Sequence, residues 1–127
     1  MIYSILIYGV EATVGAWTPE EEDAVLGRHA ELRRELTAES RLGPVLRLAP
    51  NGAKIVRRHK ERRYVTDGPF AETKEQLMGI YVVDCATFDD AVAATDRLAF
   101  DSGVFVIRPI TWLDPGAIAA KMPQQSQ

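Results

Sequence analysis

Residues 77–108 read LMGIYVVDCATFDDAVAATDRLAFDSGVFVIR, and this stretch decides the fold. Residues 77–85 are rich in β-branched and apolar side chains, which predicts a buried strand. Thr87 is a suitable N-cap, so a helix follows, and residues 101–103 (Asp-Ser-Gly) are expected to end it near its C-cap. Residues 104–108 predict a closing strand. The stretch is therefore a strand–helix–strand unit.

The helix of this unit has one apolar face at helical spacing. We expect this face to cover the two strands, because an amphipathic helix buries its apolar stripe against a neighbouring element. The side chains expected in the buried face are Phe88, Ala91, Val92, Thr95, Leu98 and Ala99.

The N-terminal part of the chain predicts a second unit of the same kind. Residues 2–8 form a strand whose two alternating sets of side chains are both apolar, as in a strand covered on both faces. Thr18, Pro19 and Glu21 predict a helix start, with an N-cap, a proline in the first helical position and a capping box. Residues 41–49 are the next expected strand.

The first predicted helix runs to about Ala38 and places a histidine on its apolar face. Val25, His29, Leu32 and Leu36 are spaced as one helical stripe. Two interpretations of His29 stay open at this point. It is a core or interface histidine with both ring nitrogens satisfied, or it is a general acid/base, since an imidazole titrates near neutrality.

A hairpin is predicted between the two units. Residues 53–58 and 63–66 are its expected strands, with the charged residues 59–62 at the tip. The element order is then strand, helix, strand, hairpin, strand, helix, strand. This is the order of an α+β ferredoxin-like plait with an inserted β-hairpin.

The predicted strands suggest a homodimer. Two helices cover one face of a sheet, yet residues 2–8, 77–85 and 104–108 are apolar on both faces. A bare apolar sheet face is larger than the exposed patch that monomers usually carry. We therefore expect a twofold dimer with two sheets face to face.

Composition bounds the class of protein. The chain has 127 residues, 46% hydrophobic and 26% charged, with a net charge of −3, which fits one soluble globular domain and excludes a disordered chain or a disulfide-rich miniprotein. The apolar opening MIYSILIYGV is too short for a membrane span and lacks the features of a signal peptide. The single Cys85 fits a reducing cytoplasm. We expect a domain in residues 1–113 and a loosely held tail in residues 114–127.

Several site signatures are missing from the sequence. It has no Walker loop, no GxGxxG and no G-x-S-x-G. Its two histidines, His29 and His59, and its one cysteine do not make a recognisable zinc site. The expectation is a protein without a metal or cofactor.

Residues 65–75, VTDGPFAETKE, are the most unusual segment. Asp67, Gly68 and Pro69 are typical turn residues, so a plain turn is one interpretation. The other is that the turn presents Asp67 at the mouth of a pocket, with Phe70 as an apolar wall and Lys74 as an anion contact.

The run YVTDGPFAETKEQLMGIYVVD resembles the DGPF signature of the YCII-related domain family. The similarity extends to the opening strand, the helix with His29, the second helix and the closing Arg108-Pro109. It implies a dimeric α/β-barrel, and a histidine and an aspartate in a cleft, here His29 and Asp67, as a proposed active site. Related domains are linked to elimination or isomerisation, and some DGPF proteins accompany extracytoplasmic-function sigma factors.

This sequence departs from the family pattern in three places. Val106 stands where an acidic residue usually precedes the closing Arg-Pro, which weakens an acid role there. Residues 38–40 (Ala-Glu-Ser) replace the usual glycine after the first helix, and the hairpin tip is more basic.

Other polar side chains have two interpretations each. Arg108 pairs with a carboxylate inside the dimer or binds an anionic substrate group. Tyr8 and Tyr81 offer a hydroxyl to a pocket or serve as packing residues. We include Tyr8, Phe70, Lys74 and Arg108 as candidate ligand-binding residues beside the candidate catalytic pair His29 and Asp67.

The small net charge conceals an uneven distribution of charged residues along the chain. Residues 51–66 hold six cationic side chains and one anionic side chain, a net charge of +5, while the rest of the chain carries −8. The hairpin is a solvated edge that resists aggregation, or it contacts an anionic ligand or an acidic partner, including the acid-rich first helix of another copy. Nucleic acid is an unlikely partner, since aromatic interleaving is missing.

Two functions follow from these residues. One is a cofactor-independent lyase or isomerase in which His29 moves a proton of a small organic molecule in a dimer cleft, Asp67 orients it, and Arg108 or Lys74 binds an anionic group. The alternative is a non-catalytic metabolite-binding or regulatory module, with a sigma factor as a candidate partner.

Overall fold

A computed structural model describes residues 1–68 and 75–118 of the chain. In chain order the elements are β1 (Ile2–Gly9), α1 (Glu11–Gly15), α2 (Pro19–Ala38), β2 (Leu42–Arg47), β3 (Lys54–His59), β4 (Arg62–Asp67), β5 (Gln76–Asp84), α3 (Phe88–Asp96) and β6 (Val104–Pro109). The predicted α+β plait with an inserted hairpin is confirmed.

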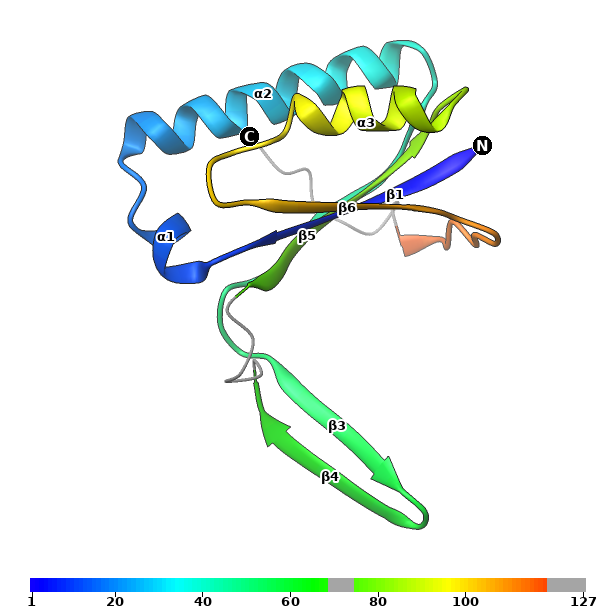
Figure 1. The fold of residues 1–127 in the computed structure, drawn as a ribbon. Helices are drawn as coiled ribbons and strands as arrows, with labels where there is room; N and C mark the ends of the chain where they lie inside the picture. Colours follow the sequence, from blue (N-terminus) through cyan, green and yellow to red (C-terminus); the bar gives the residue numbers. More distant parts are fainter. Residues whose placement is uncertain (69–74, 119–127) are drawn as a thin grey trace.

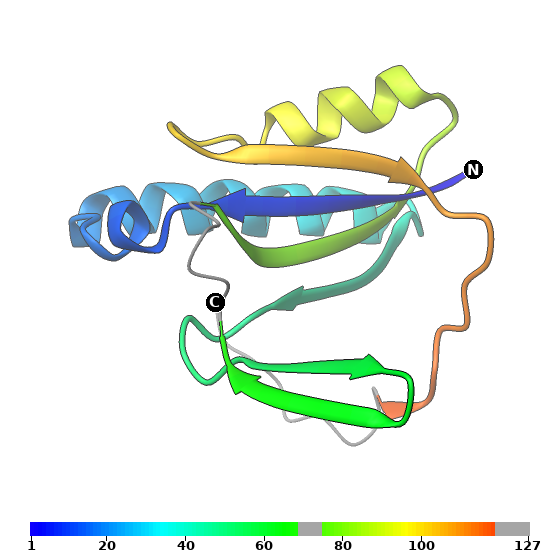
Figure 2. The ribbon, with the colours of Figure 1, turned by 60° about the horizontal axis from the view of Figure 1, so that its bottom comes forward.

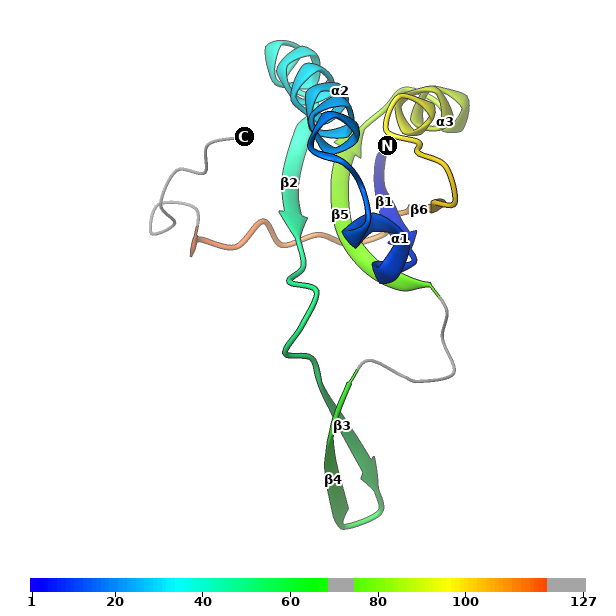
Figure 3. The ribbon, with the colours of Figure 1, turned by 90° about the vertical axis from the view of Figure 1, so that its left-hand side faces the viewer.

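The main sheet has four strands in the order β2-β5-β1-β6, and neighbouring strands are antiparallel. The two long helices α2 and α3 lie side by side on one face of this sheet (Figures 1 and 3). The helix α2 runs over β2 and β5, and α3 runs over β1 and β6. This crossing order is that of a ferredoxin-like plait.

The core lies between this sheet and the two helices. Burial alternates along β1, where Tyr3, Ile5 and Ile7 face the helices. Tyr81 and Val83 of β5 lie beside them and are almost fully buried. From the helices, the core receives Leu32 and Leu36 of α2, Ala91 and Ala94 of α3, and Leu98.

Both predicted helix starts are confirmed. The Thr18 hydroxyl accepts a hydrogen bond from the Glu21 backbone N–H at 3.1 Å, and the Glu21 carboxylate accepts one from the Thr18 N–H at 3.0 Å. At α3 the Thr87 hydroxyl accepts from the Asp90 N–H at 3.1 Å. These caps satisfy backbone donors that a helix N-terminus leaves without partners.

The predicted buried face of α3 is partly wrong. Phe88 and Val92 are 45% and 40% exposed, and Ala99 is exposed as well, whereas Ala94 is buried. Small residues in the buried line let α3 lie close to the sheet, and the larger Phe88 only reaches its edge, against the ring of Tyr3. Phe88 and Val92 therefore lie on the exposed side of α3.

The end of α3 also differs from the prediction. The helix ends at Asp96 rather than at residues 101–103. The amide N–H groups of Leu98 and Ala99 bond carbonyls three residues back, which is the tighter 3₁₀ pattern. This tightening turns Leu98 into the core, where it is fully buried. Ser102, and not Gly103, takes the left-handed conformation, with φ of 69°.

The short helix α1 was not predicted. It has five residues, no capping side chain and no buried residue, so it carries neither of the usual sequence signals for a helix. It follows β1 directly and lies beside the N-terminal end of α2 (Figure 1).

The inserted hairpin β3–β4 stands apart from the main sheet. The two strands form a sheet of their own, and Figures 1 and 2 show it projecting from the side opposite the helices. Every residue of β4 is exposed, and in β3 Ile55 alone is half-buried. We call β3–β4 the arm.

The face of the main sheet opposite the helices carries apolar side chains, as predicted. Leu6, Tyr8, Ile80 and Val82 are half-buried there, and Val104 and Val106 are 41% and 36% exposed. A second copy that covers this face stays a prediction. Among the helices of the described residues, none is long and apolar enough to cross a membrane.

Replacement of Leu98 and of Val92 by alanine tests the burial of this segment. Leu98→Ala should lower the free energy of unfolding by about 2–5 kcal/mol, as for other buried leucines. Val92→Ala should cost less than about 1 kcal/mol, since exposed sites are tolerant. Urea denaturation measures both values, and an equal loss for the two variants would contradict the observed packing.

Candidate functional site

A cavity of about 420 Å³ lies between α1, the N-terminal half of α2 and the sheet. Its volume falls in the range of small-molecule pockets, roughly 300–1,000 Å³. Most of its walls are apolar, and a few polar side chains reach it. The apolar residues are Ile7, Val14, Trp17, Val25, Leu26, Val45, Leu46, Met78 and Phe100, and the polar ones are Glu22, His29, Arg33, Arg47 and Tyr81.

The local sequence explains why the chain leaves this space. Gly79 lies at the cavity on β5, where a Cβ atom would come within 3.0 Å of the Leu46 carbonyl oxygen of β2. At the other end, the rings of Trp17 and Phe100 meet edge to face with centroids 5.1 Å apart. The rings of Trp17 and Phe100 therefore form one end of the cavity, and Gly79 has no side chain to occupy the sheet side of it.

His29 and Tyr81 form the central polar contact of the cavity. The Nδ1 atom of His29 lies 2.7 Å from the Tyr81 hydroxyl oxygen, so α2 and β5 are joined by a short hydrogen bond. Its direction sets the tautomer: if Nδ1 donates, Nε2 is a base, and if Nδ1 accepts, Nε2–H is a donor. In both cases Nε2 is the ring nitrogen left for a ligand.

The surroundings keep His29 neutral. Its pKa is lowered from 6.5 to about 4, first by burial and then by the positive charges of Arg33, Arg28 and Arg47. Burial removes water from the imidazolium, and each guanidinium repels it. At neutral pH the ring therefore holds one proton on two nitrogens, which is the form required of a general base.

Tyr81 is the neutral phenol in this contact. Burial raises the pKa of its hydroxyl, while a hydrogen bond from Arg33 and the charge of Arg33 oppose this rise. The hydroxyl therefore stays protonated at neutral pH, so it can donate a hydrogen bond to Nδ1 or accept one from it.

Cationic side chains give the cavity its electrostatic character. Arg33 and Arg47 line it, with Glu22 as the one carboxylate among its described lining residues. Arg28, which also acts on His29, is anchored elsewhere, since it donates to the Ala99 carbonyl at 3.1 Å. A cavity with apolar walls and a surplus of guanidinium groups suits a small molecule with an anionic group.

The predicted pair His29 and Asp67 is not brought together within one chain. Asp67 ends β4 at the base of the arm, is not among the cavity residues, and forms an exposed ion pair with Lys54. The reason is the insertion: residues 54–67 leave the main sheet as a separate hairpin and take the aspartate with them.

The other predicted site residues lie outside the cavity or outside the described residues. Tyr8 is on the face of β1 opposite the helices, and Arg108 is exposed on the same face of β6, opposite Ser4. Phe70 and Lys74 fall in residues 69–74, which are not described. The cavity of one chain thus contains His29 from the predicted site residues. It also contains Tyr81, for which the sequence left a pocket hydroxyl and a packing residue as the two interpretations.

Arg33 and Arg47 were not predicted as site residues. Arg33 is one turn after His29 on α2, and this i, i+4 spacing could have indicated that both lie on the same side. Arg47 had no such signal, because its position follows from the packing of β2 beside β5.

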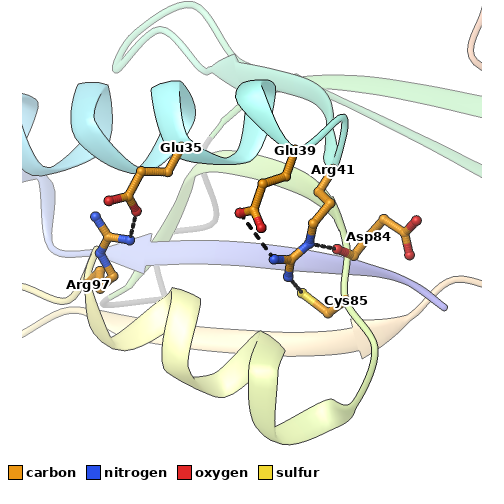
Figure 4. A network of polar contacts seen from close by, with 6 residues as sticks. All are labelled: Glu35, Glu39, Arg41, Asp84, Cys85 and Arg97. Atoms are coloured by element: carbon orange, nitrogen blue, oxygen red, sulfur yellow. Dashed lines mark hydrogen bonds and ion pairs between the residues drawn. The ribbon is translucent and has the colours of Figure 1, made fainter.

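A second, more open cavity lies at the opposite end of α2, and its polar groups are paired (Figure 4). Arg97 binds Glu35, and Arg41 binds Glu39, the Asp84 carbonyl at 2.7 Å and the Cys85 sulfur at 3.5 Å. This network joins α2 to α3 and β5. Its guanidinium groups are occupied, so its role is structural.

The described residues hold no cluster of histidine, cysteine and carboxylate side chains that could bind a metal ion. The polar groups of the His29 cavity are two guanidinium groups, an imidazole, a phenol and one carboxylate. This donor set suits an anion better than a cation.

The fold and this cavity define a ferredoxin-like protein with a small-molecule pocket between its helices and its sheet. The profile of the YCII-related domain matches residues 1–114. An uncharacterized protein of Rhizobium meliloti (strain 1021) is 38% identical over 122 residues, which cover 93% of this chain and 98% of that protein. The chain belongs to the YCII-related domain family.

The depressed pKa of His29 predicts a pH-dependent stability. The unfolded imidazole binds a proton as the pH falls through 6.5, and the folded one resists until about pH 4. The stability that neutral His29 contributes should therefore be complete above pH 6.5. It should fall by about 2 kcal/mol towards pH 4, which is less than the pKa shift alone implies because the ring borders an open cavity and solvent screens it in part.

Urea denaturation of the wild type and of His29→Gln at pH 7.5 and pH 5 measures this. Glutamine keeps a polar contact to Tyr81 and does not titrate, so the variant should lose less stability on acidification. His59→Gln, at the exposed end of β3, is the matched control. Parallel pH curves for the wild type and the His29 variant would contradict the assignment.

Proposed function

We propose that this protein is a cofactor-independent acid–base catalyst of the lyase or isomerase type that acts on a small organic acid. The observation that carries the proposal is the 2.7 Å contact between His29 and Tyr81 in an apolar cavity with Arg33 and Arg47. The proposal also places the protein in the cytoplasm, where its buried, unpaired Cys85 stays reduced.

The arginines bind the anionic group of the substrate. This is the role that the sequence analysis gave to Arg108 or Lys74. A carboxylate between Arg33 and Arg47 neutralises charges that lower the pKa of His29, so binding raises this pKa and makes the imidazole a stronger base. The substrate thereby activates the base that acts on it.

The proton then moves between substrate carbon and His29. In the Nδ1–H tautomer, Nε2 takes a proton from a carbon next to an electron-withdrawing group, and Tyr81 stabilises the imidazolium through its hydroxyl oxygen. The imidazolium returns this proton to another carbon in an isomerisation or to the leaving group in an elimination. No cofactor is consumed in either case.

A non-catalytic metabolite-binding module is the alternative, and the arm gives a reason to keep it. Its cationic surface fits an acidic protein partner, such as the sigma factor that the family resemblance implies. Such a module binds the anion at Arg33 and Arg47 and leaves it unchanged. Turnover therefore separates the two functions.

Hydrogen exchange into a panel of hydroxy- and unsaturated carboxylic acids in D₂O, followed by ¹H NMR, tests the catalytic function. The wild type should exchange a carbon-bound proton or form an elimination product. His29→Gln should reduce the rate at least about 100-fold, and His59→Gln should leave it unchanged. A panel that binds without exchange would support the binding module, and exchange at the wild-type rate in His29→Gln would contradict the catalytic role.

The anion site has its own matched pair of variants. Arg33 lines the cavity and Arg34, its neighbour on α2, is exposed. Arg33→Gln should weaken the binding of benzoate about tenfold, a loss of about 1.4 kcal/mol, and Arg34→Gln should not. Calorimetric titration measures both constants, and equal affinities would argue against a guanidinium anion site.

A further inference from the structure

The arm has a surface that nothing in the described chain covers. Val56 and Val65 lie opposite each other on its two strands and are 63% and 50% exposed. An isolated two-stranded hairpin is marginally stable in water, and a third layer is usually needed. An exposed apolar pair on such a hairpin indicates a surface that is covered in the working protein.

The same face of the arm carries an unbalanced charge. Arg58 and Arg63 are paired directly across the strands, next to the two valines in register. Like charges in opposite positions destabilise a hairpin, and among the described residues neither arginine has an ion pair. Lys54 and Asp67 complete this face on the other side of the valines. We call this set of six residues the docking face.

The first turn of α2 offers the complementary charge. It contains Glu20, Glu21 and Glu22, followed by Asp23. Glu21 is used in the capping box, whereas Glu20 and Asp23 are exposed and have no ion pair among the described residues. Glu22 belongs to the wall of the His29 cavity, so the acidic turn lies at the cavity. Val25 and Leu26 line the same cavity, so an arm docked there would find apolar side chains for its valines.

The arm and the acidic turn belong to different parts of one chain. The arm projects away from the side of the sheet opposite the helices, while α2 lies on the other side of that sheet (Figure 1). The arm of one copy is therefore free to approach a neighbour. A second copy carries the acidic turn by necessity and has an apolar sheet face that also needs cover.

We propose that the docking face of the arm binds the acidic first turn of α2 in a second copy of the chain. Two such contacts, related by a twofold axis, pair each arm with the helix of the other copy. Each arm then lies at the cavity of its partner and brings its Asp67 towards a site that contains His29. The contact follows from charge and exposure alone and does not depend on the proposed catalytic function.

Complementary charge reversal tests this proposal. Arg58→Glu with Arg63→Glu places acid against acid, and Glu20→Lys with Asp23→Lys places base against base, so each double variant alone should weaken dimerisation at least 100-fold. A mixture of the two double variants restores both contacts in a mixed dimer. Its affinity should return to within about tenfold of the wild type, measured by sedimentation velocity and native mass spectrometry.

Matched controls separate this contact from a general effect of charge. Lys60→Glu with Arg62→Glu makes the same change at the tip of the arm and on its other face, and Asp89→Lys with Asp96→Lys makes the opposite change on α3. Both should dimerise nearly as the wild type does. Circular dichroism confirms that each variant is folded.

Three results would overturn the proposal. The first is a wild-type protein that is monomeric at 100 µM, roughly the concentration at which a weak specific dimer would be populated. The second is a dimer that survives reversal of Arg58 and Arg63 unchanged, as a dimer held by the sheet faces alone would. The third is rescue by the α3 variant in place of the α2 variant.

Discussion

Two helices cover a four-stranded sheet, and the space that they leave near α1 must hold polar groups in an apolar setting. The hydrogen bond between His29 and Tyr81 makes this arrangement stable. Loss of Tyr81 would leave the Nδ1 atom of the half-buried His29 without this partner, and an unsatisfied buried polar group costs about 1–3 kcal/mol. Because the bond joins α2 to β5, it also fixes the helix above the sheet and with it the shape of the cavity.

The same bond sets the chemistry of the cavity. Burial and three guanidinium groups keep the imidazole neutral at physiological pH, and the phenol beside it stays protonated. In the proposed reaction the phenol oxygen accepts a hydrogen bond from Nδ1–H while Nε2 takes the substrate proton, and the guanidinium groups bind the anionic group. The positive charges that depress the pKa of His29 are those that a bound carboxylate offsets, so affinity and basicity are coupled.

Much of the fold was predictable from the sequence, because its signals are local. The capping box at Thr18 and the apolar run of residues 2–8 led to the right elements. Helix α1 and the early end of α3 were not predictable, since they follow from tertiary packing and not from local pattern. Within the site, the helical stripe identified His29, but the pairing with Asp67 was assumed from family resemblance. Arg47 and the contact to Tyr81 depend on how β2 and β5 lie together, which no spacing within one element reveals.

Charge segregation between the arm and the rest of the chain becomes meaningful in three dimensions. The sequence contains it as a total of +5 in residues 51–66. The structure places these charges on a projecting hairpin, apart from the acidic first turn of α2 beside the cavity. A dimer joined in this way would bring Asp67 of one chain towards the His29 cavity of the other.

The chemistry of the cavity depends on the protonation state and tautomer of His29, and ¹⁵N NMR of the imidazole ring measures both most directly. In the His59→Gln variant one imidazole remains, so its two nitrogen signals are assigned without ambiguity. At pH 7 we predict a neutral ring in one fixed tautomer, with one nitrogen signal of the protonated type and one of the unprotonated type. Two protonated nitrogens at pH 7, or two averaged signals that shift around pH 6.5, would contradict it.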